Sequence, residues 1–469
     1  MKNKIICTIG PSSNSEEVLR DLVKAGMSIA RINCSHGSIE QNEANIELVK
    51  KVRKDMGVPV SIMLDTKGPE IRIGHFDPAV KVDGGVWLEE GQTFTLQTRP
   101  TVGFENRVFV DYKKLPKVVK PGQQLLLNDG LIVMTVVSMT EFEVICRVNA
   151  GGRLGDRKSL FVPGCDLGLS FISKADELDL IMGCKTDVDW VAASFVNCAE
   201  DVIALKKVVN KYGKDIPVIS KIESKNGVEN IDEILAVTDG IMVARGDLGV
   251  EYPIEQIPTL QKMLIKKARA AGKLVVTATE MLESMIEKVR PTRAETTDVA
   301  NSLYDGTSCT MLSGETASGK HPVKVVQFMK RIAELAESFI DRKVGYRDVE
   351  IKSTGDAFAC TLTHAAVNSK AKAICAFTRS GRVARAIANF YPPCPIYAFA
   401  NNERVYHMLA AYNGVIPVLM EQVLTTHQML QASSKFVMEN KIAAKGDVII
   451  VASSFQDSKT DLVLMHPLT

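Results

Sequence analysis

The residues best suited to chemistry are charged and hydroxyl side chains at the ends of short apolar runs. Glu223 ends the run VISKIE, and Asp247 lies near the end of GIMVARGDLG. If these runs are neighbouring strands, the two carboxylates converge, and Mg²⁺ prefers such an oxygen-rich site with open positions. The alternative is that each acid caps a helix or pairs with Lys221 or Arg245. The pair of acids together with Lys221 favours the metal site.

Lys221 precedes Glu223 by two residues, so both side chains face the same side of a strand. A lysine beside metal-bound acids offers positive charge to a transferring phosphoryl group or to a developing enolate. A structural ion pair is the alternative. Arg31, Asn33 and Ser35 alternate toward one face in the same way.

A second group of oxygen atoms has a different charge. Asn33, Ser35, Asp65 and the carbonyl of Thr66 would form a cage with a single negative charge, which suits a monovalent cation better than a divalent one. We call the polar residues at the ends of the runs the strand-end cluster: Arg31, Asn33, Ser35, Asp65, Thr66, Ser194, Lys221, Glu223, Arg245, Asp247, Thr279, Ser313 and Glu315.

The elements that must position this cluster are apolar runs separated by amphipathic helical segments. Such an alternation is typical of a parallel sheet covered on both faces, and eight units would close a (β/α)8 TIM barrel with its catalytic groups at the carboxyl ends of the strands. The eight runs are IICTIG (5–10), SIARINCS (28–35), SIMLDT (61–66), WVAASFV (190–196), VISKIE (218–223), GIMVARGDLG (240–249), LVVTATE (274–280) and CTMLSGE (309–315).

The barrel requires that one stretch be set aside. Residues 70–166 contain short strands and a hairpin signal, Asn128-Asp129-Gly130, and predict an inserted all-β domain that could act as a lid over the barrel. We therefore expect a barrel domain of residues 1–69 and 167–342. Residues 343–469 predict a C-terminal open α/β domain, because strand-like runs again alternate with helices.

Composition and charge exclude several classes of protein. A net charge of +2, with basic residues interspersed among acids, argues against a nucleic-acid platform. The chain has no apolar leader and no run of about 18 apolar residues, so we expect neither secretion nor membrane spanning. The ten cysteines form no C-x-x-C pair, which indicates a reducing, cytoplasmic setting. No histidine pair has metal-ligand spacing.

One near-match to a nucleotide-binding motif is rejected. GETASGKH (314–321) approaches the P-loop pattern, but His321 replaces the hydroxyl residue that would bind Mg²⁺, and Pro322 follows at once. The loop nevertheless follows the eighth predicted strand, which is a frequent phosphate neighbourhood in such barrels.

Together the strand-end segments resemble pyruvate kinases. The resemblance covers the barrel in register, includes an insertion at the same place and extends more loosely into the C-terminal region. It rests on CTIGPSS (7–13), RINCSHG (31–37), DTKGPEIR (65–72), ISKIE (219–223), GIMVARGDLGVE (240–251), ATEMLESM (278–285), RPTRAE (290–295) and MLSGETASGK (311–320).

The resemblance implies transfer of the phosphoryl group of phosphoenolpyruvate to ADP, giving pyruvate and ATP in glycolysis. It implies Mg²⁺, for which Mn²⁺ can substitute, on Glu223 and Asp247, and K⁺ on Asn33, Ser35, Asp65 and Thr66. Arg31 and Lys221 would stabilise the phosphoryl group, Lys221 also the enolate, and Thr279 would route the proton. The remaining implied contacts are the substrate carboxylate at Gly246 and Asp247 and the nucleotide at Asn33, His36, Arg72 and Lys158.

Other features of the sequence concern the requirement for K⁺ and the regulation of activity by an effector. Glu70 matches family members that require K⁺, and Glu280 stands where a neutral residue is usual. The segment 452–468 lacks the family's glycine-rich effector loop, which argues against activation by fructose 1,6-bisphosphate. TRSGR (378–382) could still bind a phosphate of another effector through Thr378, Ser380, Gly381 and Arg382. The resemblance also implies a homotetramer.

Two rival functions remain open from the sequence. An enolate-forming lyase of the same fold would keep the Mg²⁺ site but would need neither the K⁺ cage nor the inserted domain. A non-catalytic metabolite sensor would use the C-terminal domain as its working part, and the intact set of Lys221, Glu223, Asp247 and Thr279 argues against it.

Overall fold

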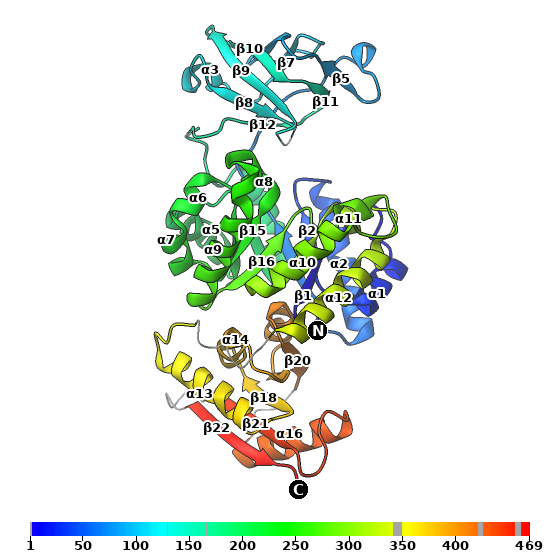
Figure 1. Ribbon diagram of the computed structural model, residues 1–469, viewed down its shortest axis with the longest axis vertical. Coiled ribbons are helices and arrows are strands. Elements are labelled where there is room, and N and C mark those ends of the chain that lie inside the picture. Colours follow the sequence, from blue (N-terminus) through cyan, green and yellow to red (C-terminus); the bar gives the residue numbers. More distant parts are fainter. Residues whose placement is uncertain (1, 129, 166, 341–348, 421–424, 455–460) are drawn as a thin grey trace.

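The computed structural model describes residues 2–128, 130–165, 167–340, 349–420, 425–454 and 461–469. Eight parallel strands close into a barrel, as predicted, with the lid at one end of the molecule and the C-terminal domain at the other (Figure 1). In barrel order these strands are β1 (Lys4–Thr8), β17 (Cys309–Leu312), β16 (Leu274–Ala278), β15 (Gly240–Ala244), β14 (Val218–Ile222), β13 (Trp190–Ala193), β3 (Ser61–Asp65) and β2 (Met27–Asn33).

Helices form the outer ring of the barrel because each presents one apolar stripe. In α1 (Glu16–Ala25) the buried stripe is Leu19, Leu22 and Ala25, the Ser15 hydroxyl accepts the Val18 N–H at the start, and Gly26 (φ 126°) ends the helix. The other main helices of the ring are α2 (Ile39–Met56), α4 (Lys174–Lys185), α5 (Ala199–Lys211), α7 (Ile231–Val237), α9 (Ile257–Ala270), α10 (Arg293–Asp305) and α12 (Pro322–Phe339).

Several strands end earlier than the apolar runs predicted. The prediction of one continuous run over 240–249 is wrong: β15 stops at Ala244, and helix α8 (Arg245–Glu251) begins at the next residue. The chain turns there because the Arg245 guanidinium donates to the carbonyls of Ala278 (3.2 Å) and Thr279 (2.6 Å) on the neighbouring strand end. Asp247 therefore lies in the first turn of a helix and not on a strand.

The run over 309–315 shows the same deviation. Strand β17 ends at Leu312, and a short helix, α11 (Gly314–Ala317), follows it. Glu315 is fully buried in that turn, and its carboxylate accepts the backbone N–H groups of Leu282 (3.1 Å) and Ser313 (2.7 Å). Glu315 therefore has a structural role, and it does not join the polar network described below.

The inserted domain lies between β3 and β13, as predicted, and is built mainly of short strands, with a short helix, α3 (Leu115–Val118), and its own apolar core. One sheet has the order β4 (Ile71–Arg72), β12 (Ser159–Phe161), β8 (Gln124–Leu127), β9 (Ile132–Met139), β10 (Glu143–Ala150), β6 (Thr93–Gln97) and β7 (Arg107–Phe109), and β11 (Gly152–Gly155) pairs with β5 (Gly85–Leu88). Strands β8 and β9 are antiparallel; the predicted turn residue 129 between them lies outside the described residues.

The C-terminal region is an open α/β domain, as predicted. Its sheet has the order β20 (Val415–Leu419), β19 (Ile396–Ala400), β18 (Ala373–Thr378), β21 (Val448–Ser454) and β22 (Asp461–Pro467), with β22 antiparallel to β21. Its helices include α13 (Thr354–Asn368), α14 (Arg382–Asn389), α15 (Glu403–Met408) and α16 (Thr426–Glu439). Residues 455–460, in the segment 452–468 that lacks the glycine-rich loop, and the expected boundaries at 166 and 342–343 lie outside the described residues.

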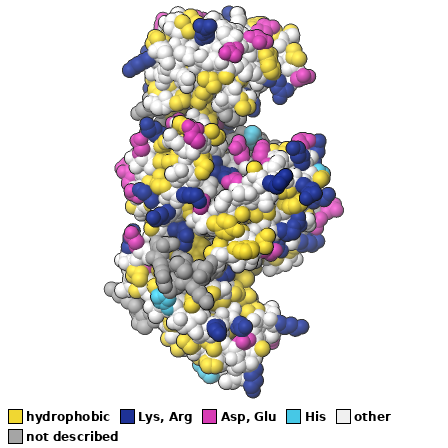
Figure 2. Space-filling model, in the orientation of Figure 1, with side chains coloured by type: hydrophobic (Ala, Val, Ile, Leu, Met, Phe, Trp, Pro, Cys, Tyr) yellow, Lys and Arg dark blue, Asp and Glu magenta, His cyan; other side chains and the backbone are white. Residues whose placement is uncertain are grey.

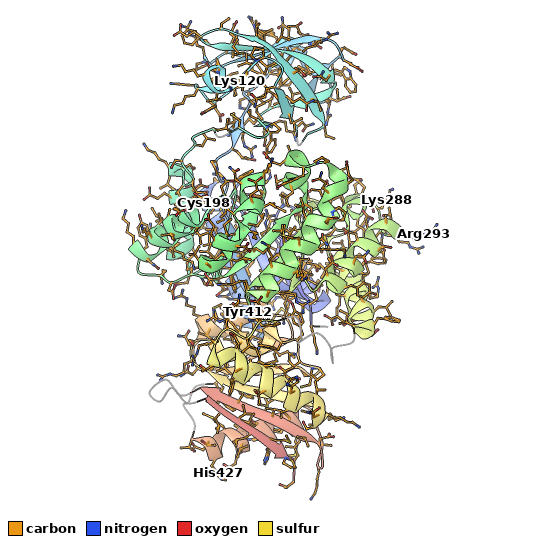
Figure 3. The ribbon with its side chains drawn as sticks, turned by 60° about the vertical axis from the view of Figure 1, so that its left-hand side comes forward. Lys120, Cys198, Lys288, Arg293, Tyr412 and His427 are labelled. Carbon is orange, nitrogen blue, oxygen red and sulfur yellow. The ribbon has the colours of Figure 1, made fainter. Side chains whose placement is uncertain are left out.

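The C-terminal domain closes the amino end of the barrel, which we call the barrel floor (Ser61, Trp190, His407, Met408 and Tyr412). The Ser61 hydroxyl donates to the His407 carbonyl, and Trp190 Nε1 donates to the Met408 carbonyl at 3.3 Å. The rings of Trp190 and Tyr412 lie 5.7 Å apart, and Tyr412 is at the junction of the two domains (Figure 3). Apolar residues of the barrel interior and of this domain form one continuous cluster.

The surface and the thiols agree with the composition. On the face in Figure 2, basic and acidic side chains are mixed and no large area carries one sign of charge. All ten cysteines are free. In the part of the chain that the structure describes, no helix has the length and apolarity needed to cross a membrane.

Candidate active site

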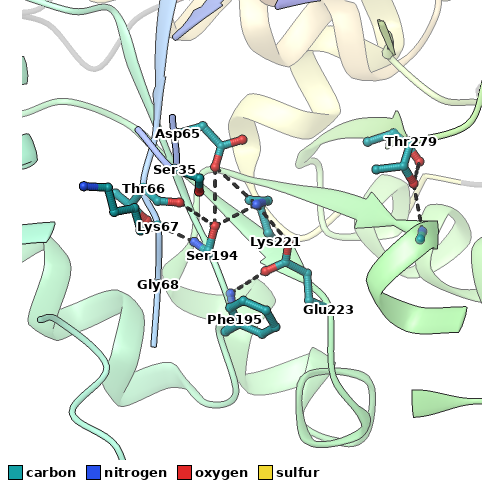
Figure 4. A network of polar contacts seen from close by, with 12 residues as sticks. Ser35, Asp65, Thr66, Lys67, Gly68, Ser194, Phe195, Lys221, Glu223 and Thr279 are labelled. Carbon is teal, nitrogen blue, oxygen red and sulfur yellow. Dashed lines mark hydrogen bonds and ion pairs between the residues drawn. The ribbon is translucent and has the colours of Figure 1, made fainter. Parts of the chain in front are cut away.

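Lys221 is the centre of a buried polar network at the carboxyl end of the barrel (Figure 4). Its ammonium lies 2.8 Å from Glu223 Oε1 and 3.2 Å from Asp65 Oδ1, and it donates to Ser194 Oγ at 2.7 Å. Burial disfavours the charged amine, but Asp65 and Glu223 outweigh this effect and raise the pKa of Lys221 above its ordinary value. Lys221 is therefore a fixed positive charge.

Asp65 bridges Lys221 to a second cation. Its carboxylate is fully buried, and Oδ2 lies 2.6 Å from Arg31 Nε. Burial alone would raise the pKa of Asp65, but Arg31 and Lys221 hold it below its usual range. Arg31 also donates from Nη1 to Thr8 Oγ1 (2.9 Å). Two cations thus share the Asp65 carboxylate, and Glu223 is a second acid on Lys221.

Glu223 and Asp247 form a pair of like charges in this buried setting. Burial raises the pKa of Asp247 to about 8, and the Glu223 carboxylate adds to the effect while Lys221 opposes it. Glu223 Oε2 also accepts the Phe195 N–H at 2.6 Å. Arg245 does not compensate Asp247, because its guanidinium holds both Asp298 oxygens at 2.6 and 2.7 Å. Two adjacent carboxylates that repel each other, Glu223 buried and Asp247 half-buried, fit a divalent cation.

The residues predicted to form a cage lie where β2 and β3 end: Asn33 and Asp65 are the last residues of these strands, and Ser35 and Thr66 lie on the loops that follow. The Cys34 N–H donates to the Asp65 carbonyl (2.9 Å), which joins the two loops. Asn33 Oδ1 accepts the Ser35 N–H at 3.1 Å, and Ser35 lies beside Asp65 and Thr66 in Figure 4. The four oxygen ligands offered to a cation are an amide, a hydroxyl, a backbone carbonyl and one carboxylate, a set that fits a monovalent cation.

A close approach of backbone fixes the loop after β3. Gly68 (φ 73°) packs so tightly on Ser194 that an added Cβ would lie 2.8 Å from the serine Cβ. The N–H groups of Lys67 and Gly68 both donate to Asp176 Oδ1 at 3.1 Å. The position therefore requires glycine, and the loop that carries Asp65 and Thr66 is held from two sides.

Thr279 has an unusual backbone conformation at the end of β16. Thr279 and Glu280 have φ values of 67° and 53°, and left-handed backbone is costly for a β-branched residue such as threonine. The Arg245 guanidinium binds the Thr279 carbonyl in this turn. The Thr279 hydroxyl accepts the Gly246 N–H (2.8 Å) and donates to the Ala278 carbonyl (2.6 Å). Glu280 is exposed.

The predicted nucleotide residues come together from the barrel and the lid. Burial lowers the pKa of His36, and the Arg72 and Arg31 guanidinium groups lower it further, with a smaller effect of Lys158. Arg72 pairs with Glu70 at 2.5 Å, and Glu70 accepts the Ser159 hydroxyl at 3.2 Å. A cavity of about 440 Å³ between lid and barrel is lined by residues that include Glu70 and Phe195.

Some residues that we singled out lie elsewhere. Thr378 ends β18 and Gly381 (φ 80°) precedes α14. The TRSGR segment therefore belongs to the C-terminal domain and not to the barrel that carries Lys221 (Figure 1). Lys320 of the near-P-loop segment forms a surface ion pair with Glu287 at 2.5 Å. This pairing agrees with the rejection of a P-loop.

The sequence did not assign roles to several residues of the network. Ser194 was placed in the strand-end cluster without a function, and Thr8, the Phe195 N–H and Asp298 were not considered at all. A hydroxyl toward the carboxyl end of the predicted run 190–196 is the only signal for Ser194. Asp298 lies on helix α10, where nothing in its spacing indicated contact with Arg245.

Comparisons with known proteins were made for the whole chain. Residues 1–326 match the family model "Pyruvate kinase, barrel domain" and residues 356–466 match "Pyruvate kinase, alpha/beta domain". A pyruvate kinase of Clostridium acetobutylicum is 43% identical, covering 96% of each chain, and one of Thermotoga maritima is 40% identical, covering 96% of this chain and 95% of its own.

A solved structure agrees with these matches. The crystal structure of a pyruvate kinase from Cryptosporidium parvum has a TM-score of 0.92 and 37% identity, covering 100% of this chain and 96% of that one. The likeness therefore covers the barrel, the lid and the C-terminal domain together. From these matches, the chain belongs to the pyruvate kinase family.

Proposed function

We propose that this chain transfers the phosphoryl group of phosphoenolpyruvate to ADP, giving pyruvate and ATP, at the network around Lys221. The observation that carries the proposal is a buried lysine held charged between Glu223 and Asp65. A third acid, Asp247, lies beside Glu223, and burial and the Glu223 charge both disfavour its ionised form. Phosphoryl transfer depends on positioning and charge neutralisation more than on covalent help, and this network supplies both.

We assign the stabilisation of the transferring phosphoryl group to Lys221 and Arg31. Both cations are fixed by Asp65, so they cost little reorganisation when negative charge develops nearby. After transfer, the same Lys221 charge would stabilise the enolate oxygen.

Glu223 and Asp247 would hold Mg²⁺, or Mn²⁺ in its place. A divalent cation bound there would neutralise negative charge on the substrate and on the two acids. The backbone amides of Gly246 and Asp247 would receive the substrate carboxylate. In the structure the Gly246 N–H is held by the Thr279 hydroxyl, so substrate binding would exchange that bond.

K⁺ would bind Asn33, Ser35, Asp65 and the Thr66 carbonyl, where it would add one positive charge near the phosphoryl group. Glu70 points to this requirement through the family resemblance. Replacing K⁺ by Na⁺ at constant ionic strength should cut the rate severely, and an equal rate in the two salts would refute the assignment.

Thr279 would help to deliver the proton to the enolate carbon. Its hydroxyl is oriented by two hydrogen bonds in a strained turn, which sets the direction of the oxygen toward Gly246. The exposed Glu280 beside it adds no buried charge to this route.

Asn33, His36, Arg72 and Lys158 would bind the nucleotide. Because Arg72 and Lys158 belong to the lid and His36 to the barrel, a nucleotide held by all of them would draw the two domains together and exclude water. We divide the chain accordingly into a catalytic barrel (1–69 and 167–342), a lid (70–166) and a C-terminal regulatory or interface domain (343–469).

For the C-terminal domain we propose a phosphate contact at Thr378, Ser380, Gly381 and Arg382. An effector other than fructose 1,6-bisphosphate, or none, fits the absence of the glycine-rich loop from the sequence. We also propose a cytoplasmic homotetramer with this domain at one interface.

The test is a coupled assay. Purified protein with phosphoenolpyruvate, ADP, Mg²⁺ and K⁺ should form pyruvate, followed through lactate dehydrogenase. No turnover would sink the proposal; activity that does not need ADP would favour an enolate-forming lyase, and metabolite binding without turnover would favour a sensor. A panel of sugar phosphates added to the same assay would identify an effector.

A further inference from the structure

Ser194 connects Lys221 to the predicted monovalent-cation cage, two parts of the site whose roles are otherwise separate. It follows β13, the strand between β3 and β14 in the barrel, and its side chain is nearly fully buried, with 2% of the residue exposed. Its backbone N–H donates to Thr66 Oγ1 at 3.2 Å, which ties it to the loop after β3. A buried hydroxyl at this place has only a few possible partners.

The direction of the hydroxyl bonds follows from the chemistry of the partners. An ammonium group has no acceptor, so Ser194 Oγ must accept from Lys221 Nζ (2.7 Å). Its single proton is then available for one acceptor. The Thr66 carbonyl lies at 2.7 Å, whereas Asp65 Oδ1 lies at 3.4 Å, so the proton is donated to Thr66.

We propose that Ser194 is a positioning residue that joins Lys221 to the monovalent-cation cage through the Thr66 carbonyl; the inference rests on the proposed function. A cation bound by that carbonyl fixes the oxygen to which Ser194 donates, and Ser194 in turn fixes the Lys221 ammonium. The monovalent cation would therefore act on phosphoryl transfer partly through the position of Lys221 and not only through its own charge.

A merely structural role makes a different prediction. If Ser194 only satisfied buried polar groups, its loss would lower stability without changing the response to K⁺. The matched control is Ser220, a fully buried serine on β14 whose hydroxyl donates to Thr238 Oγ1 at 2.9 Å and to no residue of the site.

The experiment compares Ser194→Ala and Ser220→Ala in the full chain by two readouts. The first needs no catalysis: the melting temperature is followed as KCl replaces tetramethylammonium chloride at constant ionic strength, since a bound cation stabilises the folded state. The second is kcat and KM in the coupled assay at saturating K⁺. Ser194→Cys, with a weak donor of similar size, carries the same test if the alanine variant does not fold.

We expect Ser194→Ala to raise the KCl concentration at half-maximal stabilisation about tenfold and to lower kcat about 10- to 100-fold, as for loss of a hydrogen bond to a charged group. Ser220→Ala should keep the wild-type KCl response. An unchanged KCl response in Ser194→Ala, or the same shift in Ser220→Ala, would overturn the proposal.

The two proposals fail separately. If the melting temperature of the wild-type protein does not change with K⁺, both the cation cage and this inference are wrong. The reaction of phosphoenolpyruvate with ADP would still be decided by pyruvate formation alone.

Discussion

The two ends of the barrel are built by the same strands but are held together by different interactions. Strand β3 begins with Ser61, which bonds the C-terminal domain, and ends with Asp65 between Lys221 and Arg31. Strand β13 begins with Trp190 on the barrel floor and leads to Ser194 in the polar network. A strand of four or five residues thus runs from a packed interface to a charged site.

The difference between the ends shows where stability and chemistry are placed. At the floor, Trp190 and Tyr412 belong to an apolar cluster continuous with the C-terminal core, with two hydrogen bonds beside it, so these side chains are stabilised mainly by burial. At the carboxyl end, buried charges are paired mainly with each other, and one acid, Asp247, is left with a raised pKa. Such an arrangement costs stability and is typical of a functional site.

The largest effect that would sharpen this contrast is expected from Lys221→Met. Removing the charge at the centre of the network should lower kcat by at least about a hundred- to a thousandfold, with a smaller change in KM for phosphoenolpyruvate, because the charge acts on the transition state. The control is Lys225→Met, an exposed lysine just after the same strand. Steady-state kinetics that place both variants within a factor of three of wild type would contradict the assignment.

At the floor, Trp190→Ala should act on stability instead. The side chain is fully buried, so its truncation should reduce the free energy of unfolding by about 3–5 kcal/mol. Denaturant unfolding measures this, with Trp87→Ala as the control because Trp87 is 62% exposed on the lid. The contrast between the ends breaks down if the folded Trp190 variant loses kcat as severely as Lys221→Met.

A smaller effect, on acid stability, is expected from His407. Burial lowers its pKa to about 3, with Arg53 adding to the shift. The unfolded chain therefore binds a proton below its ordinary pKa of about 6.5 while the folded chain does not, so stability is lost as the pH falls from about 6.5 toward 3. In His407→Gln, the free energy of unfolding should therefore depend less steeply on pH over this range than in wild type.

The control for that experiment is the exposed His427, at the far end of the C-terminal domain (Figure 3). His427→Gln should leave the acid slope as it is in wild type. Equal slopes in wild type and in His407→Gln would show that the floor is not sensitive to this titration.

The smallest effect is expected from Glu280→Gln. Glu280 is exposed although it follows Thr279, so restoring the neutral residue usual in the family should change kcat by less than about twofold. A larger change, seen in kcat between pH 6 and 9, would mean that the charge does reach the proton route.

The sequence predicted the parts of this site that depend on local spacing. Lys221 and Glu223, two residues apart on a strand, do meet at 2.8 Å, and the strand ends of the barrel do bring Arg31 and Asp65 together. The eight barrel strands and the inserted domain could be predicted because their patterns differ. Strands buried on both faces are continuous apolar runs, whereas strands with one exposed face alternate apolar and polar residues.

The remaining features depend on contacts between distant residues. The start of α8 at Arg245 is set by carbonyls of the next strand, so Asp247 was placed on the wrong element. The left-handed turn at Thr279 has no local signal, because threonine disfavours it. The partners of Ser194 come from two other strands, and no spacing within its own segment could identify them.

The lid has one further consequence that follows from its separate core. Its buried apolar residues form a cluster of their own, which Leu167 and Leu169 of the connecting segment also contact, whereas the barrel interior and the C-terminal domain share a cluster. The lid is thus a self-contained folding unit joined to the barrel by two chain segments, while the other two domains should unfold as one cooperative body.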